Sequence, residues 1–104
     1  DDPETLRARD WHAYCTAEAG DAAGASDLYA DLVPDRIRVL GPDHPDTLHA
    51  QFQYARYTAA AGDMGAARDA FADLLSVRDR VLGPDDPETL RARDWHAYCT
   101  AEAG

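Results

Sequence analysis

The sequence predicts an all-α protein, an α-solenoid of stacked helix-turn-helix repeats, and three observations support this fold class. Residues 1–20 and 85–104 are identical, and residues 1–42 match residues 43–84 at 22 of 42 positions. Apolar side chains recur at helical spacing, and no segment alternates polar and apolar residues with the period of two that a strand requires. Self-similarity at a fixed period of this length is typical of stacked repeat architectures.

The repeat also predicts how a single domain is organised. We expect a first repeat at residues 1–42, a second at 43–84 and a half repeat at 85–104. Because a two-helix unit buries its apolar face only against neighbours, the half repeat is expected to be a terminal capping helix. The expected elements are five antiparallel helices near residues 3–19, 21–40, 45–61, 63–82 and 87–103.

The first helix of each repeat is predicted to start at a proline and to stop at a glycine. Proline suits the first helical position, where an N–H would lack a partner anyway, and the prolines concerned are Pro3, Pro45 and Pro87. Asp2 and Asp86 precede two of them as N-caps, whereas His44 is a poorer cap. Glycine permits a left-handed exit from a helix, and the glycines are Gly20, Gly62 and Gly104.

The second helix of each repeat is predicted to begin after Asp21 or Asp63 and to end at a Gly-Pro pair. Its apolar stripe includes a small residue, Ala25 or Ala67, where neighbouring helices are expected to approach closely. Pro34 interrupts the stripe of the first repeat, so we expect this helix to bend or to lose a turn there.

The composition is acidic and disfavours some classes of partner. Twenty Asp and Glu residues against ten Arg give a net charge of −10, which argues against nucleic acid and anionic membranes as partners. No segment is apolar enough for a membrane span, and no signal peptide is apparent. Cys15 and Cys99 occupy equivalent repeat positions, far apart in a stack, so we expect no disulfide and a cytoplasmic location. The lack of Lys and Asn indicates a bacterial sequence of high GC content.

The repeats resemble tetratricopeptide repeats of the long, 42-residue type, known from kinesin light chains and from the sensor arrays of bacterial STAND-type ATPases. The resemblance covers the whole chain. It rests on the linker LGPDHPDTL at residues 40–48, which recurs as LGPDDPETL at 82–90, and on small and aromatic residues at fixed spacing. These residues are Ala13, Ala55, Ala97, Gly20, Gly62, Ala25, Ala67, Tyr29 and Phe71. The chain departs from the family pattern at positions just before the first-helix alanine, which hold Trp11, His12, Tyr54, Trp95 and His96.

The resemblance implies a non-catalytic protein–protein interaction scaffold that binds a peptide or a partner helix on the concave face of its first helices. Carried over position by position, the groove residues are Arg7, Asp10, Trp11, Tyr14, Glu18, His49, Phe52, Gln53, Arg56, Arg91, Asp94, Trp95, Tyr98 and Glu102. Aromatic and Arg side chains are typical of binding hot spots, and the acidity favours a basic ligand. The alternative is structural: an engineered or excised repeat that associates head to tail with its own copies through identical terminal helices.

The sequence contains no recognisable catalytic or cofactor-binding motif, so we expect no enzyme, no cofactor and no metal site. His12 and Cys15 share a helix face, as do His96 and Cys99. We interpret both pairs as packing residues, with zinc shared between two molecules and a nucleophilic thiol as the alternatives.

Two other polar groups have simple structural interpretations. His44 and His49 flank the start of the first helix of the second repeat, where helix capping explains them better than metal ligation. A calcium site would need a loop of oxygen ligands. We therefore interpret the acidic residues on the second helix of the first repeat as a solvated outer face with arginines close by. The residues are Asp27, Asp31, Asp35, Arg36 and Arg38.

Overall fold

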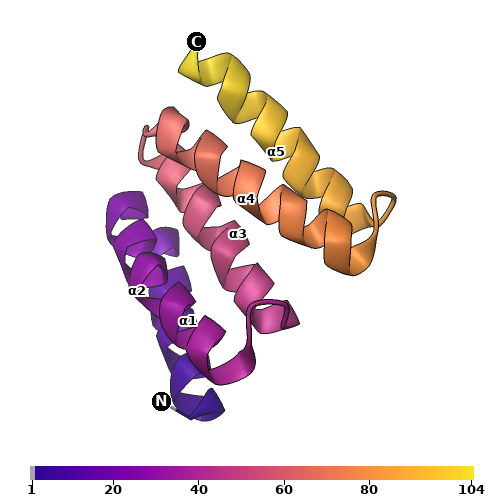
Figure 1. Ribbon diagram of the computed structural model, residues 1–104. Helices are drawn as coiled ribbons and strands as arrows, with labels where there is room; N and C mark the ends of the chain where they lie inside the picture. Colours follow the sequence, from indigo (N-terminus) through magenta and orange to yellow (C-terminus); the bar gives the residue numbers. More distant parts are fainter. Residues whose placement is uncertain (1) are drawn as a thin grey trace.

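Five α-helices form the part of the chain that the structure, a computed structural model, describes, which is residues 2–104 (Figure 1). They are α1 (Pro3–Glu18), α2 (Ala22–Leu40), α3 (Pro45–Ala60), α4 (Met64–Leu82) and α5 (Pro87–Ala103). No strand occurs between residues 2 and 104. The predicted all-α fold is confirmed, and every helix begins and ends within one residue of the expected position.

The first helices begin where a side chain caps the backbone. Asp86 accepts a hydrogen bond from the Glu88 N–H at 2.9 Å. His44, the poorer cap on sequence grounds, makes the equivalent bond, because its Nδ1 atom accepts from the Asp46 N–H at 3.0 Å. Each bond satisfies an N–H that has no partner within its own helix.

Pro34 lies inside α2 without ending it. α2 and α4 are both 19 residues long, although α4 has Ser76 at the position of Pro34. The expected loss of a turn is therefore wrong. Proline removes the hydrogen bond to the carbonyl four residues earlier, and that residue, Ala30, is exposed, so water can satisfy its carbonyl instead.

The helices pack in chain order, and each contacts mainly the helices next to it (Figure 1). Ala25 and Ala67 are fully buried, as predicted for points of close approach. Two clusters of buried side chains form the core, one among α1, α2 and α3 and the other among α3, α4 and α5. α3 contributes to both clusters and so buries apolar side chains on two of its faces.

Arg36 and Arg78 occupy the same position of the two repeats, and both are buried, at 2% and 4% exposure. Arg36 donates from Nη1 to the carbonyl of Asp46 at 2.9 Å, and Arg78 donates from Nη1 to the carbonyl of Glu88 at 3.0 Å. Asp27 and Asp31 are exposed, as expected of a solvated face, but Arg36 does not lie close by on that face, because its buried side chain ties α2 to the start of α3. Burial holds the pKa of Arg78 below its usual value.

α1 and α5 have the same sequence but bury different faces. α1 buries Leu6 and Ala13, whereas the equivalent Leu90 and Ala97 of α5 are exposed. α5 buries a different set, Thr89, Ala92 and Cys99, whose counterparts in α1 are exposed. The two helices therefore present different sides of one sequence to the rest of the molecule.

Among the helices of residues 2–104, none combines the length and the apolar character needed to cross a membrane.

Candidate functional site

The first helices of the repeats, α1, α3 and α5, line two hollows. The hollow between α1 and α3 has a volume of 540 Å³. Its lining side chains are Arg7, Asp10, Trp11 and Tyr14 from α1, and His49 and Gln53 from α3. We call it the α1 hollow. The structure thus brings together six of the groove residues that the resemblance implies.

The second hollow, here called the α5 hollow, has a volume of 690 Å³ and lies where α3, the start of α4 and α5 meet. Four of its lining residues are also among the implied groove residues, namely Arg56, Asp94, Trp95 and Tyr98. The other four are Tyr57, Ala59, Ala60 and Met64. α3 therefore has a hollow on each side, one with α1 and one with α5.

Helical spacing explains why these side chains gather. Arg7, Asp10, Trp11 and Tyr14 stand at i, i+3, i+4 and i+7, a spacing that places side chains on one face of a helix. α5 repeats the same four residues 84 positions later. α3 lies between the two helices and presents different side chains to each, with His49 and Gln53 toward α1 and Arg56 toward α5.

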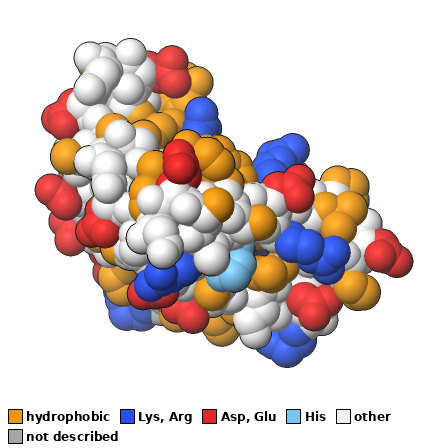
Figure 2. Space-filling model, turned by 90° about the horizontal axis from the view of Figure 1, so that it is seen from above, with side chains coloured by type: hydrophobic (Ala, Val, Ile, Leu, Met, Phe, Trp, Pro, Cys, Tyr) orange, Lys and Arg blue, Asp and Glu red, His pale blue; other side chains and the backbone are white. Residues whose placement is uncertain are grey.

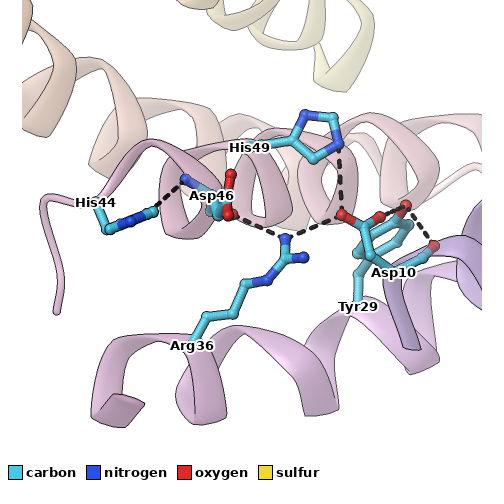
Figure 3. Close-up of polar contacts among 6 residues, drawn as sticks. All are labelled: Asp10, Tyr29, Arg36, His44, Asp46 and His49. Carbon is cyan, nitrogen blue, oxygen red and sulfur yellow. Dashed lines mark hydrogen bonds and ion pairs between the residues drawn. The ribbon is translucent and has the colours of Figure 1, made fainter. Parts of the chain in front are cut away.

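Asp10 is held by three side chains at the edge of the α1 hollow (Figure 3). The Tyr29 hydroxyl donates to its Oδ1 at 2.6 Å, and Arg36 Nη1 lies 3.0 Å from its Oδ2. His49 Nε2 lies 3.7 Å from the same Oδ2. Burial, together with the hydrogen bond to Asp10, raises the pKa of Tyr29 well above its usual value, so this hydroxyl stays a donor.

Asp94, the equivalent of Asp10 in α5, is exposed and has no hydrogen bond or ion pair with any residue in 2–104. Within residues 2–104, no second helix packs on this face of α5 to supply a tyrosine and an arginine, as α2 does for α1. The two hollows therefore differ in charge. The carboxylate of the α1 hollow is neutralised by its neighbours, and that of the α5 hollow is available to a ligand.

The two tryptophans occupy equivalent positions of α1 and α5, but their surroundings differ. Trp11 is 66% exposed and stacks on Tyr14, with ring centroids 5.6 Å apart. Trp95 is half-buried, because it stacks on Phe71 of α4 at 5.5 Å and meets the edge of Phe52 at 6.4 Å. The face drawn in Figure 2 has hydrophobic side chains exposed between interspersed acidic and basic ones.

Four of the implied groove residues do not line either hollow. Phe52 is only 8% exposed and packs in the core, with the Arg78 guanidinium 5.0 Å from its ring centroid. Its implied place on the groove surface is corrected by this burial, which arises because α3 turns Phe52 toward α4. The other three, Glu18, Arg91 and Glu102, are exposed outside the hollows.

The sequence reasoning missed Tyr57 and Met64 of the α5 hollow. Tyr57 follows Arg56 directly but stands four residues after Gln53, which lines the α1 hollow, so helical spacing did not assign it to the α5 hollow. It is 6% exposed, with the Arg56 guanidinium 5.1 Å from its ring centroid, and burial raises its pKa. Met64 opens a second helix, and no first-helix pattern could have indicated it.

The two cysteines are free, and they differ in access. Cys15 is exposed, whereas Cys99 is fully buried and burial raises its pKa. The packing interpretation therefore holds for Cys99 and is wrong for Cys15, which has no helix covering it. Zinc shared between molecules is also ruled out as a role for Cys99, because another molecule cannot reach the thiol. No group of three or more His, Cys, Asp or Glu side chains within residues 2–104 is arranged to hold a metal ion.

Comparison with known proteins gives a family and a fold. The family model described as tetratricopeptide repeat matches residues 4–79. The crystal structure of a Podosopora anserina putative kinesin light chain with nearly identical TPR-like repeats aligns with a TM-score of 0.84 and 22% sequence identity. A crystal structure of a single-substitution variant of that protein aligns with the same TM-score and identity. Each alignment covers 100% of this chain and 49% of the other, so this chain spans about half the length of those proteins. No curated protein sequence matches.

Proposed function

Because this chain belongs to the tetratricopeptide-repeat family, we propose that it is a non-catalytic protein-interaction module that holds a peptide or a partner helix along α1, α3 and α5. Repeats of this family generally mediate protein–protein interaction. The observation that carries the proposal is the pair of adjoining hollows on either side of α3. Their exposed aromatic side chains, Trp11 at 66% and Tyr98 at 50%, are of the kind that anchors partners.

The charge of the surface favours a basic partner. The chain carries a net charge of −10, which speeds the approach of cationic ligands and disfavours acidic ones. Within the α5 hollow, Asp94 offers a carboxylate that no described residue neutralises. A peptide that pairs an apolar anchor with an arginine or lysine would match this hollow. The two free cysteines suit a reducing compartment, and we place the module in the cytoplasm.

The proposal is tested by titrating the chain with short synthetic peptides that pair leucine or phenylalanine with arginine, and with matched peptides in which glutamate replaces arginine. We expect the basic peptides alone to bind, with weaker affinity at high salt. Trp11→Ala and Tyr98→Ala should each weaken binding by about tenfold or more. Ile37→Ala, which removes a 37% exposed side chain from α2, is the control and should change nothing. Equal affinities in all three variants would contradict peptide binding along α1, α3 and α5.

A second candidate function is structural, the association of copies of the chain through their terminal helices. The observation that favours it is that α1 and α5 share one sequence and bury different faces of it. Exchange of an identical element is a low-cost route to oligomers. The expected sign is a mass in solution that rises with protein concentration, whereas a constant monomer mass would leave the interaction module as the sole candidate.

A further inference from the structure

A third hollow lies on the other side of α3, where this helix meets the second helices α2 and α4. Its volume is 310 Å³, and we call it the outer hollow. Its lining includes Val33 from α2, Gln51 and Tyr54 from α3, and Asp73, Leu74 and Val77 from α4. Gln51 follows His49 of the α1 hollow by two residues, which at about 3.6 residues per turn places it on nearly the opposite side of α3. The outer hollow is therefore separate from the α1 and α5 hollows.

Two oxygen acceptors of the outer hollow lack a donor. The Oε1 atom of Gln51 is buried and makes no hydrogen bond within residues 2–104. Asp73 is exposed and has no hydrogen bond or ion pair with any residue in this range. A buried acceptor without a partner has given up its bonds to water and gained none in return, which is why such atoms are rare in folded proteins. The outer hollow thus offers two acceptors to a ligand that carries donors.

The first repeat shows which group fits between these positions. Gln51 and Val77 occupy the positions of Arg9 and Asp35 in the first repeat. Arg9 Nη1 donates to Asp35 Oδ2 at 2.7 Å, and this bond joins α1 to α2. Gln51 is shorter and uncharged, and the side chain of Val77 has no acceptor, so α3 and α4 have no such pair. The first repeat therefore holds a guanidinium between the two positions that line the outer hollow in the second.

We propose that the outer hollow binds an arginine side chain of a partner protein, at a site separate from the hollows along the first helices. The guanidinium is planar and carries several N–H donors, which suits the acceptors of Gln51 and Asp73 better than the compact ammonium of lysine. The net charge of −10 attracts such a cation to the surface.

The remaining walls of the outer hollow match the rest of an arginine side chain. Val33, Leu74 and Val77 offer apolar contacts to its methylene groups. Tyr54 adds an aromatic side chain, and guanidinium groups stack favourably on aromatic rings. The last torsion of a glutamine side chain is soft, so the amide of Gln51 turns its oxygen toward a donor that enters.

A titration of the isotope-labelled chain with N-acetyl-arginine amide, followed by nuclear magnetic resonance, tests this site. We expect the side-chain amide signals of Gln51 to shift, with a dissociation constant on the order of millimolar for a single side chain. N-acetyl-lysine amide is the matched probe and should bind about tenfold more weakly. Equal binding of the two probes would overturn the recognition of a guanidinium by two acceptors.

Asp73 and Asp31 provide matched variants, because they occupy the same position of the two repeats, both are exposed, and of the two it is Asp73 that lines the outer hollow. Asp73→Asn should weaken the binding of N-acetyl-arginine amide by about tenfold. Asp31→Asn should leave it nearly unchanged. Equal losses in the two variants would indicate general attraction to an acidic surface and would overturn the site.

Two further variants distinguish the outer hollow from the first-helix hollows. Gln51→Arg gives the second repeat the residue that the first repeat has, so it should fill the outer hollow from within and abolish binding of the probe. Trp11→Ala alters the α1 hollow and should leave this binding unchanged. Circular dichroism checks that both variants stay folded. Binding that survives Gln51→Arg, or that is lost in Trp11→Ala, would place the arginine along the first helices and overturn the inference.

Discussion

α1 and α5 are one helical sequence in two surroundings, and their comparison separates what the sequence determines from what the neighbours determine. Both helices begin at a proline behind an aspartate cap, because these signals are local. Their burial is not shared: Leu6 is 1% exposed and Leu90 is 39% exposed. In a stack of repeats, a first helix buries one face when the second helix packed on it follows it in the chain. It buries another face when that second helix precedes it.

The central helix, α3, supports this explanation, since it has a second helix on each side. It buries Leu48 and Ala55, the equivalents of the residues that only α1 buries. It also buries Thr47, Ala50 and Tyr57, the equivalents of those that only α5 buries. Each terminal helix thus buries one of the two sets of side chains that the central helix buries.

The largest expected effect is on stability at the shared leucine position. Leu6→Ala should lower the free energy of unfolding by about 2–5 kcal/mol, because it leaves a cavity between α1 and α2. Leu90→Ala should cost much less, since its side chain already meets water. Urea unfolding followed by circular dichroism gives both values, and equal losses would contradict the difference in surroundings.

The second-largest expected effect is on stability at the aspartate position that α1 and α5 share. Asp10→Ala leaves the buried Arg36 guanidinium and the Tyr29 hydroxyl without their carboxylate, and we expect a loss of about 1–3 kcal/mol. Asp94→Ala removes an exposed carboxylate with no partner in residues 2–104, so we expect a change of under about 0.5 kcal/mol. Thermal melts of the two variants check the order, and the reverse order would refute it.

Larger side chains test the face that α5 buries against α4 and that α1 leaves exposed. Ala92 of α5 is fully buried, and Ala8 of α1 is exposed. Ala92→Leu should therefore cost about 1–3 kcal/mol, whereas Ala8→Leu should be nearly neutral. Ala67→Leu, at a fully buried position of α4, should behave like Ala92→Leu. A neutral Ala92→Leu would mean that α5 does not pack closely on α4.

The smallest expected effect is a pH dependence that arises in part from the contact between α1 and α2. Hydrogen bonds from Arg9 and Arg38 hold the pKa of Asp35 below its ordinary value of 3.8. A carboxyl with a lowered pKa stabilises the folded state above its unfolded value and loses this contribution as the pH falls through its folded value. Asp35→Asn should therefore reduce the extra stability seen at neutral pH relative to strong acid. Asp27→Asn, on the exposed face of α2, is the control and should leave the acid profile unchanged.

The sequence was sufficient to predict the helices because their signals are local. Proline at the first position, aspartate caps and the glycine exits placed every boundary to within one residue. Ala25 and Ala67 were also predictable, since the repeat aligned them at one structural position. Most of the residues that the resemblance placed in the groove do line the two hollows, because helical spacing carries them to one face.

The remaining features depended on packing that no single helix encodes. Phe52 aligns with Asp10 and Asp94, yet it lies in the core because α4 covers that side of α3. Arg36 looked like a surface charge, although its recurrence at Arg78 was a signal that a fixed structural role was repeated. The difference between Trp11 and Trp95 could not be predicted, because the two residues have identical sequence on both sides.

The two cysteines provide the most direct measurement of the central claim, since they occupy the same position of the same sequence. Cys15 is exposed, and Cys99 is fully buried with a raised pKa that further lowers its reactivity. Alkylation of the folded chain, followed by peptide mass analysis, should label Cys15 quickly and Cys99 only as fast as the chain unfolds. Denaturant should bring both thiols to the same rate. Equal labelling of both cysteines in the folded chain would contradict the claim that one helical sequence buries different faces at the two ends of the stack.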